Sequence, residues 1–325
     1  MSFRFVSFLA FVATATCIPT SDIQRRTSRT SAPSGCLTVG TGGTYSTIGD
    51  ALTALGSSTS AACIYIAAGT YKEQLTIDYG GSLTLYGETN DTGTYKNNAV
   101  TVTHTISSSE AGSLDSSSTV NVVSNGFKMY NINVVNGYGK GSQAVALTAN
   151  ANELGFYGCQ FSGYQDTLYA KAGYQYYSNC MIEGAVDYIF GDASAWFGEC
   201  DIVSNGGGSI TANSREDSSD ASWYCFENCN VTAASGISLA GEVYLGRPWR
   251  ALARVIYQKC VLSDVINAAG WDTLADGAKP LYYEYNNSGA GSDTSHRLYE
   301  SSITAAVAKT TVLGSSWGDW VDRTY

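Results

Sequence analysis

Short alternating segments dominate the hydrophobic pattern of this chain, and no long stretch keeps a helical period. The stretch "CIYIAAGTYKEQLTI" (Cys63–Ile77) alternates apolar and polar residues, as strands do. "GDALTALGS" (Gly49–Ser57) instead predicts a short helix that caps the N-terminal end of the fold. "SREDSSDAS" (Ser214–Ser222) is typical of a polar loop, and a covering segment with some helix is expected over about residues 305–320.

Five cysteines share one local setting: a polar residue or glycine, the cysteine, one further residue, and an apolar residue. They are Cys159, Cys180, Cys200, Cys229 and Cys260. "MYNINVV" (Met129–Val135) resembles this pattern without a cysteine, with Asn131 or Asn133 in its place. A repeat of short strands at this spacing predicts an all-β solenoid, in which equivalent residues of neighbouring coils stack about 4.8 Å apart.

The cysteines need no chemical role, because buried Cys packs as a small apolar side chain in an internal ladder. Stacked neighbours would also fall within the Cα range of a disulfide. Cys36 and Cys63 are candidates for a separate bridge near the N-terminus. A zinc site is not expected, because "CFENC" has the wrong spacing and the chain has only 2 His.

The N-terminus predicts secretion. Arg4 precedes the apolar run Phe5–Ala15, which is too short to span a bilayer and ends in small residues. We therefore expect a signal peptide over residues 1–17, a short pro-segment over residues 18–30 and one catalytic domain over residues 31–325. Three glycosylation sequons, which begin at Asn90, Asn230 and Asn286, agree with an extracellular protein.

Composition narrows the class of partner. The chain has 325 residues, 35 of them Gly and 23 Tyr, which agrees with an all-β protein that has many turns. Its net charge of −10 argues against nucleic acid or an anionic membrane surface as a partner.

Two aspartates lie in unusually aromatic and apolar surroundings, in "GYQDTLYA" (Gly163–Ala170) and "DYIFGDAS" (Asp187–Ser194). Asp166 and Asp187 are as far apart in sequence as the first two repeat cysteines. That interval is one coil of the solenoid, so one aspartate should lie above the other.

Two glutamines and an arginine are expected near the aspartates. Gln143 precedes Gln165 by almost the same interval and should lie one coil further along. The two glutamines and the two aspartates are thus expected to converge on one patch. Arg247 in "LGRPWR" lies three coils beyond Asp187 by count, or fewer if loops such as 214–222 bulge out.

The predicted patch suits acid–base and nucleophilic chemistry. Like-charge repulsion raises the pKa of one of two neighbouring carboxyls, while a nearby arginine keeps the other ionised. One carboxyl then serves as a general acid and the other as a nucleophile, and the two amides can stabilise an oxyanion. The aromatic residues of the same motifs suit a cleft for sugar rings; they are Tyr164, Tyr169, Tyr188, Phe190 and Trp249.

Each residue also has a structural explanation when it is taken alone. An Asp in a solenoid usually caps a turn, Gln often forms a stacked polar ladder, and an Arg before Pro-Trp can belong to a packed ion pair. The common register of five such residues favours an active site over these separate explanations.

The motifs resemble those of the pectin methylesterases. Five matching segments occur in the order and spacing of that family, and the resemblance extends from about Gly35 to Trp320. They are "GTYKE" (Gly69–Glu73), "QAVAL" (Gln143–Leu147), "GYQDTLY" (Gly163–Tyr169), "DYIFG" (Asp187–Gly191) and "LGRPW" (Leu245–Trp249). Tyr188 stands where many members carry Phe, and no large inhibitor-like pro-region is present, as in the fungal or bacterial type.

The resemblance implies a right-handed parallel β-helix that hydrolyses the C6 methyl esters of homogalacturonan in pectin. It implies Asp187 as nucleophile and Asp166 as the acid that protonates methanol and then activates water. Gln143 and Gln165 would stabilise the oxyanion, and Arg247 would orient Asp187. Trp249 and Phe190 would line the sugar cleft, where Tyr164 is also expected. Neither a metal nor a cofactor is implied, and we expect a monomer.

Other functions predict different features. A polygalacturonase-like glycosidase would carry Asn-Thr-Asp, Asp-Asp and Gly-His-Gly motifs, which the sequence lacks. A calcium-dependent pectate lyase could use Arg247 as its base but needs a cluster of acidic ligands that is not visible. A non-catalytic wall-binding solenoid would not need the two aspartates in register with two glutamines. A Ser-His-Asp esterase is disfavoured, because His104 and His296 lie far from any Gly-x-Ser-x-Gly segment.

Overall fold

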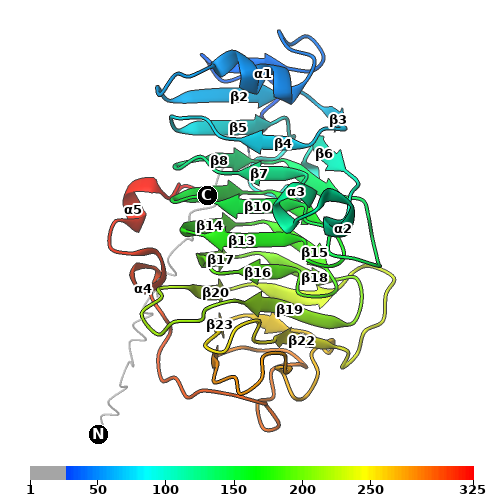
Figure 1. The fold of residues 1–325 in the computed structure, drawn as a ribbon, viewed down its shortest axis with the longest axis vertical. Helices are drawn as coiled ribbons and strands as arrows, with labels where there is room; N and C mark the ends of the chain where they lie inside the picture. Colours follow the sequence, from blue (N-terminus) through cyan, green and yellow to red (C-terminus); the bar gives the residue numbers. More distant parts are fainter. Residues whose placement is uncertain (1–26) are drawn as a thin grey trace, which may run out of the picture.

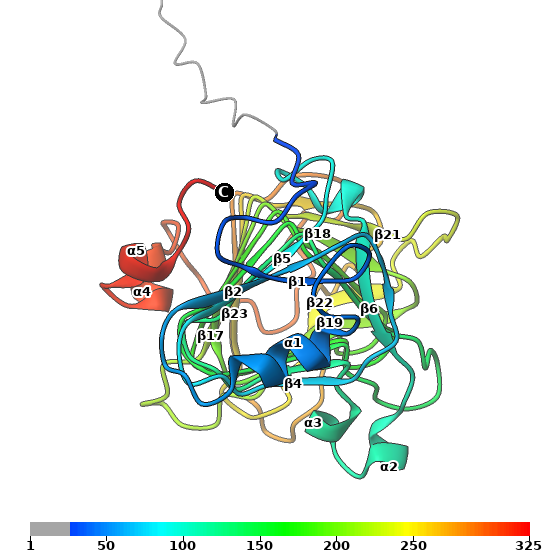
Figure 2. The same cartoon turned by 90° about the horizontal axis from the view of Figure 1, so that it is seen from above.

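Three parallel sheets wrap around a common axis to form a right-handed parallel β-helix, as the sequence predicted (Figure 1). The computed structural model describes residues 27–325. The predicted signal peptide and most of the predicted pro-segment therefore lie outside the described residues. Seen along the axis, the coils enclose a single continuous interior (Figure 2). No helix between Thr27 and Tyr325 has the length and apolar character needed to cross a bilayer.

The three sheets have ten, seven and eight strands. The ten-stranded sheet consists of β1 (Leu37–Val39), β2 (Ala62–Ile66), β5 (Leu83–Gly87), β8 (Lys128–Tyr130), β11 (Leu154–Tyr157), β14 (Tyr174–Ser178), β17 (Ser194–Gly198), β20 (Trp223–Glu227), β23 (Arg254–Gln258) and β25 (Leu281–Tyr285). The seven-stranded sheet consists of β4 (Leu75–Ile77), β7 (Val120–Val122), β10 (Leu147–Asn150), β13 (Leu168–Ala172), β16 (Ile189–Gly191), β19 (Gly208–Asn213) and β22 (Val243–Gly246). The eight-stranded sheet consists of β3 (Gly69–Tyr71), β6 (Val100–His104), β9 (Asn133–Asn136), β12 (Gln160–Ser162), β15 (Met181–Gly184), β18 (Asp201–Ser204), β21 (Asn230–Ala233) and β24 (Val261–Leu262).

The helices are short and lie outside the coils or at their N-terminal end (Figure 2). They are α1 (Ile48–Leu55), the 3₁₀ turn η1 (Tyr95–Asn97), α2 (Ser108–Ala111), α3 (Leu114–Ser117), α4 (Lys309–Leu313) and α5 (Trp317–Trp320). Helices α4 and α5 pack on the outer face of the ten-stranded sheet, where Val312, Leu313 and Trp320 are buried. This confirms the predicted covering segment near the C-terminus.

Helix α1 closes the N-terminal end, as predicted. The Thr47 side chain caps it by accepting a hydrogen bond from the N–H of Asp50. The carboxylate of Glu73 accepts the N–H groups of Ile48 and Gly49, both at 2.9 Å. An anion at a helix N-terminus is favourable, so the Glu73 of the "GTYKE" motif has a structural role here. The Cys36–Cys63 disulfide ties the first coil together, which confirms the predicted bridge.

An aromatic ladder runs through the interior beneath the ten-stranded sheet. Each ring belongs to a residue that pairs with the next ring residue on the neighbouring strand. The centroids of successive rings are 4.4–4.8 Å apart, close to the coil spacing. The ladder consists of Phe156, Tyr177, Phe197, Phe226 and Tyr257. Offset stacking of this kind adds to the free energy gained by burying each ring.

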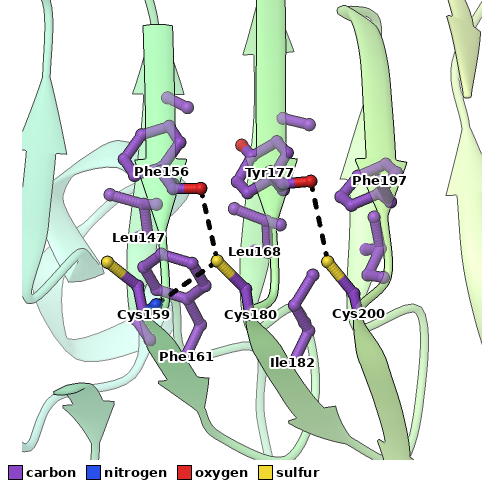
Figure 3. Packing of buried hydrophobic residues seen from close by; sticks show 14 of the residues in the cluster. Leu147, Phe156, Cys159, Phe161, Leu168, Tyr177, Cys180, Ile182, Phe197 and Cys200 are labelled. Atoms are coloured by element: carbon purple, nitrogen blue, oxygen red, sulfur yellow. Dashed lines mark hydrogen bonds between the residues drawn. The ribbon is translucent and has the colours of Figure 1, made fainter. Parts of the chain in front are cut away.

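The predicted cysteine ladder is buried beside the aromatic one (Figure 3). All five repeat cysteines are free thiols, and their Sγ atoms donate to carbonyls of neighbouring coils. Cys180 donates to the carbonyl of Phe156 and Cys200 to that of Tyr177, at 3.4 and 3.7 Å. The residue before each cysteine has a positive φ and forms the sharp corner between two sheets. These corner residues are Gly158, Asn179, Glu199, Asn228 and Lys259.

The coil that lacks a cysteine corrects one prediction. Gln160 pairs with Asn133 and Phe161 with Val134, so Ile132 occupies the cysteine position. Ile132 is fully buried, whereas Asn131 has φ 54° and takes the corner position. The prediction that Asn131 or Asn133 replaces the cysteine was therefore wrong, because an apolar residue fills the interior there.

We expect Phe197→Ala to lower the free energy of unfolding by about 3–5 kcal/mol. Phe197 is fully buried and stacks on Tyr177 and Phe226, so truncation leaves a cavity inside two neighbouring coils. Urea unfolding followed by tryptophan fluorescence measures the change, with the exposed Val261→Ala as a matched control. A loss below about 1 kcal/mol would show that the ladder rearranges to fill the space.

Candidate active site

Asp166 and Asp187 occupy equivalent bends on adjacent coils, as their spacing in the sequence predicted. Leu168 pairs with Ile189 just after the two bends, so the register between these coils equals the spacing of the two aspartates. Both aspartates have positive φ, 62° and 50°. Non-glycine residues rarely adopt this conformation, and such positions often mark functional sites.

The two bends are fixed by backbone hydrogen bonds between coils. The N–H of Asp166 donates to the carbonyl of Val186 at 3.1 Å, and the N–H of Asp187 donates to that of Ser209 at 2.7 Å. One coil on the other side, the N–H of Ala144 donates to the carbonyl of Gln165 at 3.0 Å. Strand pairing therefore positions each bend against the next.

An open cleft of about 570 Å³ lies over this part of the seven-stranded sheet. Seven residues predicted from the sequence line it: Gln143, Gln165, Asp166, Asp187, Phe190, Arg247 and Trp249. A cleft of this size accommodates a small ligand or part of a polymer chain.

Arg247 holds Asp187 through a two-pronged ion pair. Its Nε donates to Oδ1 of Asp187 and its Nη2 to Oδ2, both at 2.8 Å. This hydrogen bonding to Asp187 raises the pKa of Arg247.

Arg247 lies two coils beyond Asp187 in the order β16, β19, β22. The coil between β19 and β22 is long in sequence because it contains loop 214–222 and the segment after β21. The count of three coils was therefore too high, and the alternative of fewer coils with bulging loops is the one observed.

Asp166 is an acid that keeps its proton at neutral pH. Its side chain is deeply buried, and burial is the main cause that raises its pKa to about 8. The charge of Asp187 raises it further, while Arg247 acts in the opposite direction. The site therefore pairs a protonated carboxyl with a carboxylate fixed by an arginine.

The two glutamines lie at the rim of this pair. Gln143 is exposed, and its Oε1 accepts a hydrogen bond from the hydroxyl of Ser108 at 3.3 Å. With its side-chain carbonyl occupied, the amide N–H₂ of Gln143 is the end left to serve a ligand. Gln165 is half-buried and lies one residue before Asp166.

Two of the five predicted aromatic residues line the cleft, and the other three do not; the latter are Tyr164, Tyr169 and Tyr188. Phe190 stacks on Tyr169 with 4.3 Å between ring centroids, and Trp249 lies 5.8 Å from Phe190. Tyr188 is instead fully buried in the core, where its hydroxyl contacts that of Ser204. Tyr164 does not line the cleft, so its predicted role in substrate binding has no support in this geometry.

Six further residues line the cleft that sequence reasoning did not single out. They are Leu114, Ala212, Arg250, Leu274, Ala275 and Asp276. Arg250 follows Trp249 directly, lies over its ring and pairs with Glu216 at 3.9 Å. Most of the others come from connections between strands, where no repeat marks them. Within residues 27–325, no three His, Cys, Asp or Glu side chains are grouped so as to hold a metal ion.

Comparison with known proteins agrees with this geometry. The family model described as Pectinesterase matches residues 37–321. The chain is 77% identical over 316 residues to a probable pectinesterase A of Aspergillus niger, covering 97% of each chain. It is 68% identical to pectinesterase A of Emericella nidulans, covering 99% of this chain and 98% of the relative.

Solved structures give the same result. The crystal structure of a deglycosylated pectin methylesterase from Aspergillus niger superimposes with a TM-score of 0.91 at 79% identity, covering 92% of this chain and all of that one. A pectin methylesterase from carrot superimposes with a TM-score of 0.80 at 29% identity, covering 88% of this chain and 96% of that one. On the evidence of its β-helix, its cleft and these similarities, the chain belongs to the pectinesterase family.

Proposed function

We propose that this pectinesterase hydrolyses the C6 methyl esters of homogalacturonan with Asp187 as nucleophile and Asp166 as general acid and base. The observation that carries this assignment is that one cleft holds an ionised aspartate beside a protonated one. Arg247 binds both oxygens of Asp187, whereas the buried Asp166 retains its proton to a pH of about 8. Acyl transfer by this route needs a carboxylate as nucleophile and a protonated carboxyl as general acid at the same time.

In the first half-reaction, a carboxylate oxygen of Asp187 attacks the carbonyl carbon of the ester. The carbonyl oxygen becomes an oxyanion, to which the amide groups of Gln143 and Gln165 donate. Asp166 then gives its proton to the methoxy oxygen, the C–O bond breaks and methanol leaves. The C6 acyl group remains bound to Asp187 as an anhydride.

In the second half-reaction, the now ionised Asp166 accepts a proton from water. The resulting nucleophile attacks the C6 carbonyl carbon, and the same amides stabilise the second oxyanion. Asp187 leaves as a carboxylate and Asp166 is protonated again. The product forms as neutral galacturonic acid and becomes the carboxylate when it loses its proton to solvent, so proton and charge balance over one turnover.

Arg247 serves this cycle in two ways. Its paired hydrogen bonds fix the direction in which the Asp187 carboxylate points. Its charge also compensates the anion whenever Asp187 is released from the acyl intermediate. The half-buried Trp249 offers an apolar face against which a sugar ring can pack, and the buried Phe190 supports it from 5.8 Å away. This packing would hold the ester over Asp187.

Two rival activities find less support in this cleft. A pectate lyase would need a group of acidic calcium ligands, and no such group of three occurs among the described residues. A polygalacturonase-like glycosidase would carry Asn-Thr-Asp, Asp-Asp and Gly-His-Gly motifs, and the sequence has none of them. We also propose that residues 1–17 direct secretion and that the mature protein acts as a monomer.

We expect the protein to release methanol from methylated pectin without shortening the chain. The assay compares methanol with new reducing ends and with unsaturated ends, and repeats each measurement in excess chelator. Unchanged methanol release in chelator is expected, because the catalytic groups are all side chains of the protein. Rapid chain cleavage without methanol, or activity that returns only with calcium, would contradict the proposed function.

A further inference from the structure

A row of residues in register leads away from the cleft across the seven-stranded sheet. Phe190 pairs with Tyr169, Tyr169 with Thr148, Thr148 with Asn121, and Asn121 with Thr76. Each step is one coil, or about 4.8 Å. The row therefore extends well beyond the catalytic groups, towards the N-terminal end.

A second cavity, of about 320 Å³, lies at the far end of this row. Its lining is polar and comes from strands β4 and β7 and from helix α3 with its flanks; the residues are Gln74, Thr76, Asp115, Ser116, Ser118 and Asn121. Thr148 is buried between the two cavities, and its hydroxyl lies 2.6 Å from the hydroxyl of Ser118. Helix α3 thus separates the catalytic cleft from the polar cavity.

An ion pair marks this separation. Lys171 on β13 pairs with Asp115 on α3, and its ammonium lies 5.3 Å from the centre of the Tyr169 ring. Leu114, the neighbour of Asp115, lines the catalytic cleft, while Asp115 itself lines the second cavity. A polymer that leaves the cleft along the row therefore passes both charges.

The charges of this pair are partly accessible and incompletely satisfied. The side chains of Lys171 and Asp115 are 30% and 39% exposed. One carboxylate oxygen of Asp115, Oδ1, is buried without a hydrogen-bond partner among the described residues. Because this oxygen is buried, a ligand in the cavity does not contact it, but the charge of the carboxylate still disfavours another anion nearby.

We propose that the Asp115–Lys171 pair selects an esterified, uncharged galacturonate at the sugar position over Tyr169, next to the catalytic one. This inference rests on the proposed function of the cleft. Asp115 neutralises Lys171, so a free carboxylate at that position finds no unpaired cation and faces Asp115. A methyl ester meets no such repulsion. The enzyme then prefers stretches that still carry esters and removes them in a scattered pattern.

Two substitutions should change this preference in opposite directions. The measured quantity is the ratio of KM on sparsely methylated pectin to KM on densely methylated pectin. Asp115→Asn keeps the size of the side chain and frees Lys171, so it should lower this ratio about fivefold. Lys171→Met leaves Asp115 uncompensated and should raise the same ratio by a similar factor. Asp319→Asn on α5 removes the same charge on the face that carries the C-terminal helices, and it should leave the ratio unchanged.

Thermal unfolding and the ester pattern after partial digestion complete the experiment. A purely structural pair would lower Tm in both variants and move KM alike on both substrates. Opposite shifts in the ratio, with longer demethylated blocks for Asp115→Asn, support the selection. Methanol release with an unaltered ratio and pattern in both variants overturns this inference alone, whereas absence of methanol release by the wild-type protein overturns the proposed function.

Discussion

Asp187→Asn is expected to reduce turnover by about 10⁵–10⁶-fold, as the loss of a nucleophile does in other acyl-transfer enzymes. An amide oxygen is a much weaker nucleophile than a carboxylate, and it cannot form the anhydride from which water regenerates the enzyme. The substitution preserves the size of the side chain and its bend, since asparagine also tolerates positive φ. Methanol release under substrate saturation measures the loss.

The control for this variant is its fold and its affinity for pectin. Tm should change little, because Asn can still accept one hydrogen bond from Arg247. Pectin binding should persist, because Phe190 and Trp249 remain in place. A variant that is folded and retains near wild-type turnover would refute the assignment of Asp187 as nucleophile.

Asp166→Asn is expected to lower kcat by about 10²–10⁴-fold, the usual contribution of a general acid or base. In the wild-type protein, kcat/KM should fall as the pH rises through about 8, because Asp166 then loses the proton that methanol needs. The variant has no such proton to lose, so this alkaline limb should disappear from its profile. A limb that persists in the variant would assign the titration to another group.

The same residue makes stability depend on pH. The pKa of Asp166 is about 8 in the folded protein and 3.8 in the unfolded chain, so the folded state holds one extra proton between these values. Its contribution to stability is complete below pH 3.8 and is lost as the pH rises through 8. Asp166→Asn should therefore flatten the fall in unfolding free energy over this window, as urea titrations at several pH values would measure.

Periodicity explains what could be predicted from the sequence. Strands that repeat at a fixed place in each coil indicate a β-helix. The spacing of Asp166 and Asp187 in the sequence equals the spacing of paired residues on adjacent coils, such as Leu168 and Ile189. The same reasoning erred at Ile132, because the pattern of polar residues around it resembled the cysteine setting shifted by one position. Positions inside coils are therefore predictable to within about one residue.

Connections between strands obey no such rule. Leu274 and Asp276 line the cleft from a segment without repeats, and Leu114 does so from a short helix inserted between β6 and β7. The distance in coils to Arg247 also depended on loop 214–222, whose length does not reveal where it protrudes. The tyrosines present a different difficulty. Tyr188 and Phe190 are two residues apart, so the alternation of a strand would place both side chains on one face. Tyr188 faces the core instead because β16 begins only at Ile189, after the bend at Asp187.

The division of the catalytic groups among coils restricts how the chain can change by insertion and deletion. Loops between strands differ widely in length within this chain. Cys229 and Cys260 lie much further apart in sequence than Cys180 and Cys200, yet all of them belong to the same ladder. The segment from Asp166 to Asp187 has no such freedom, because one additional coil there would move the acid about 4.8 Å further from the nucleophile. This chain should therefore tolerate insertions at its rims, whereas the coil-to-coil step between the two aspartates has to keep its length.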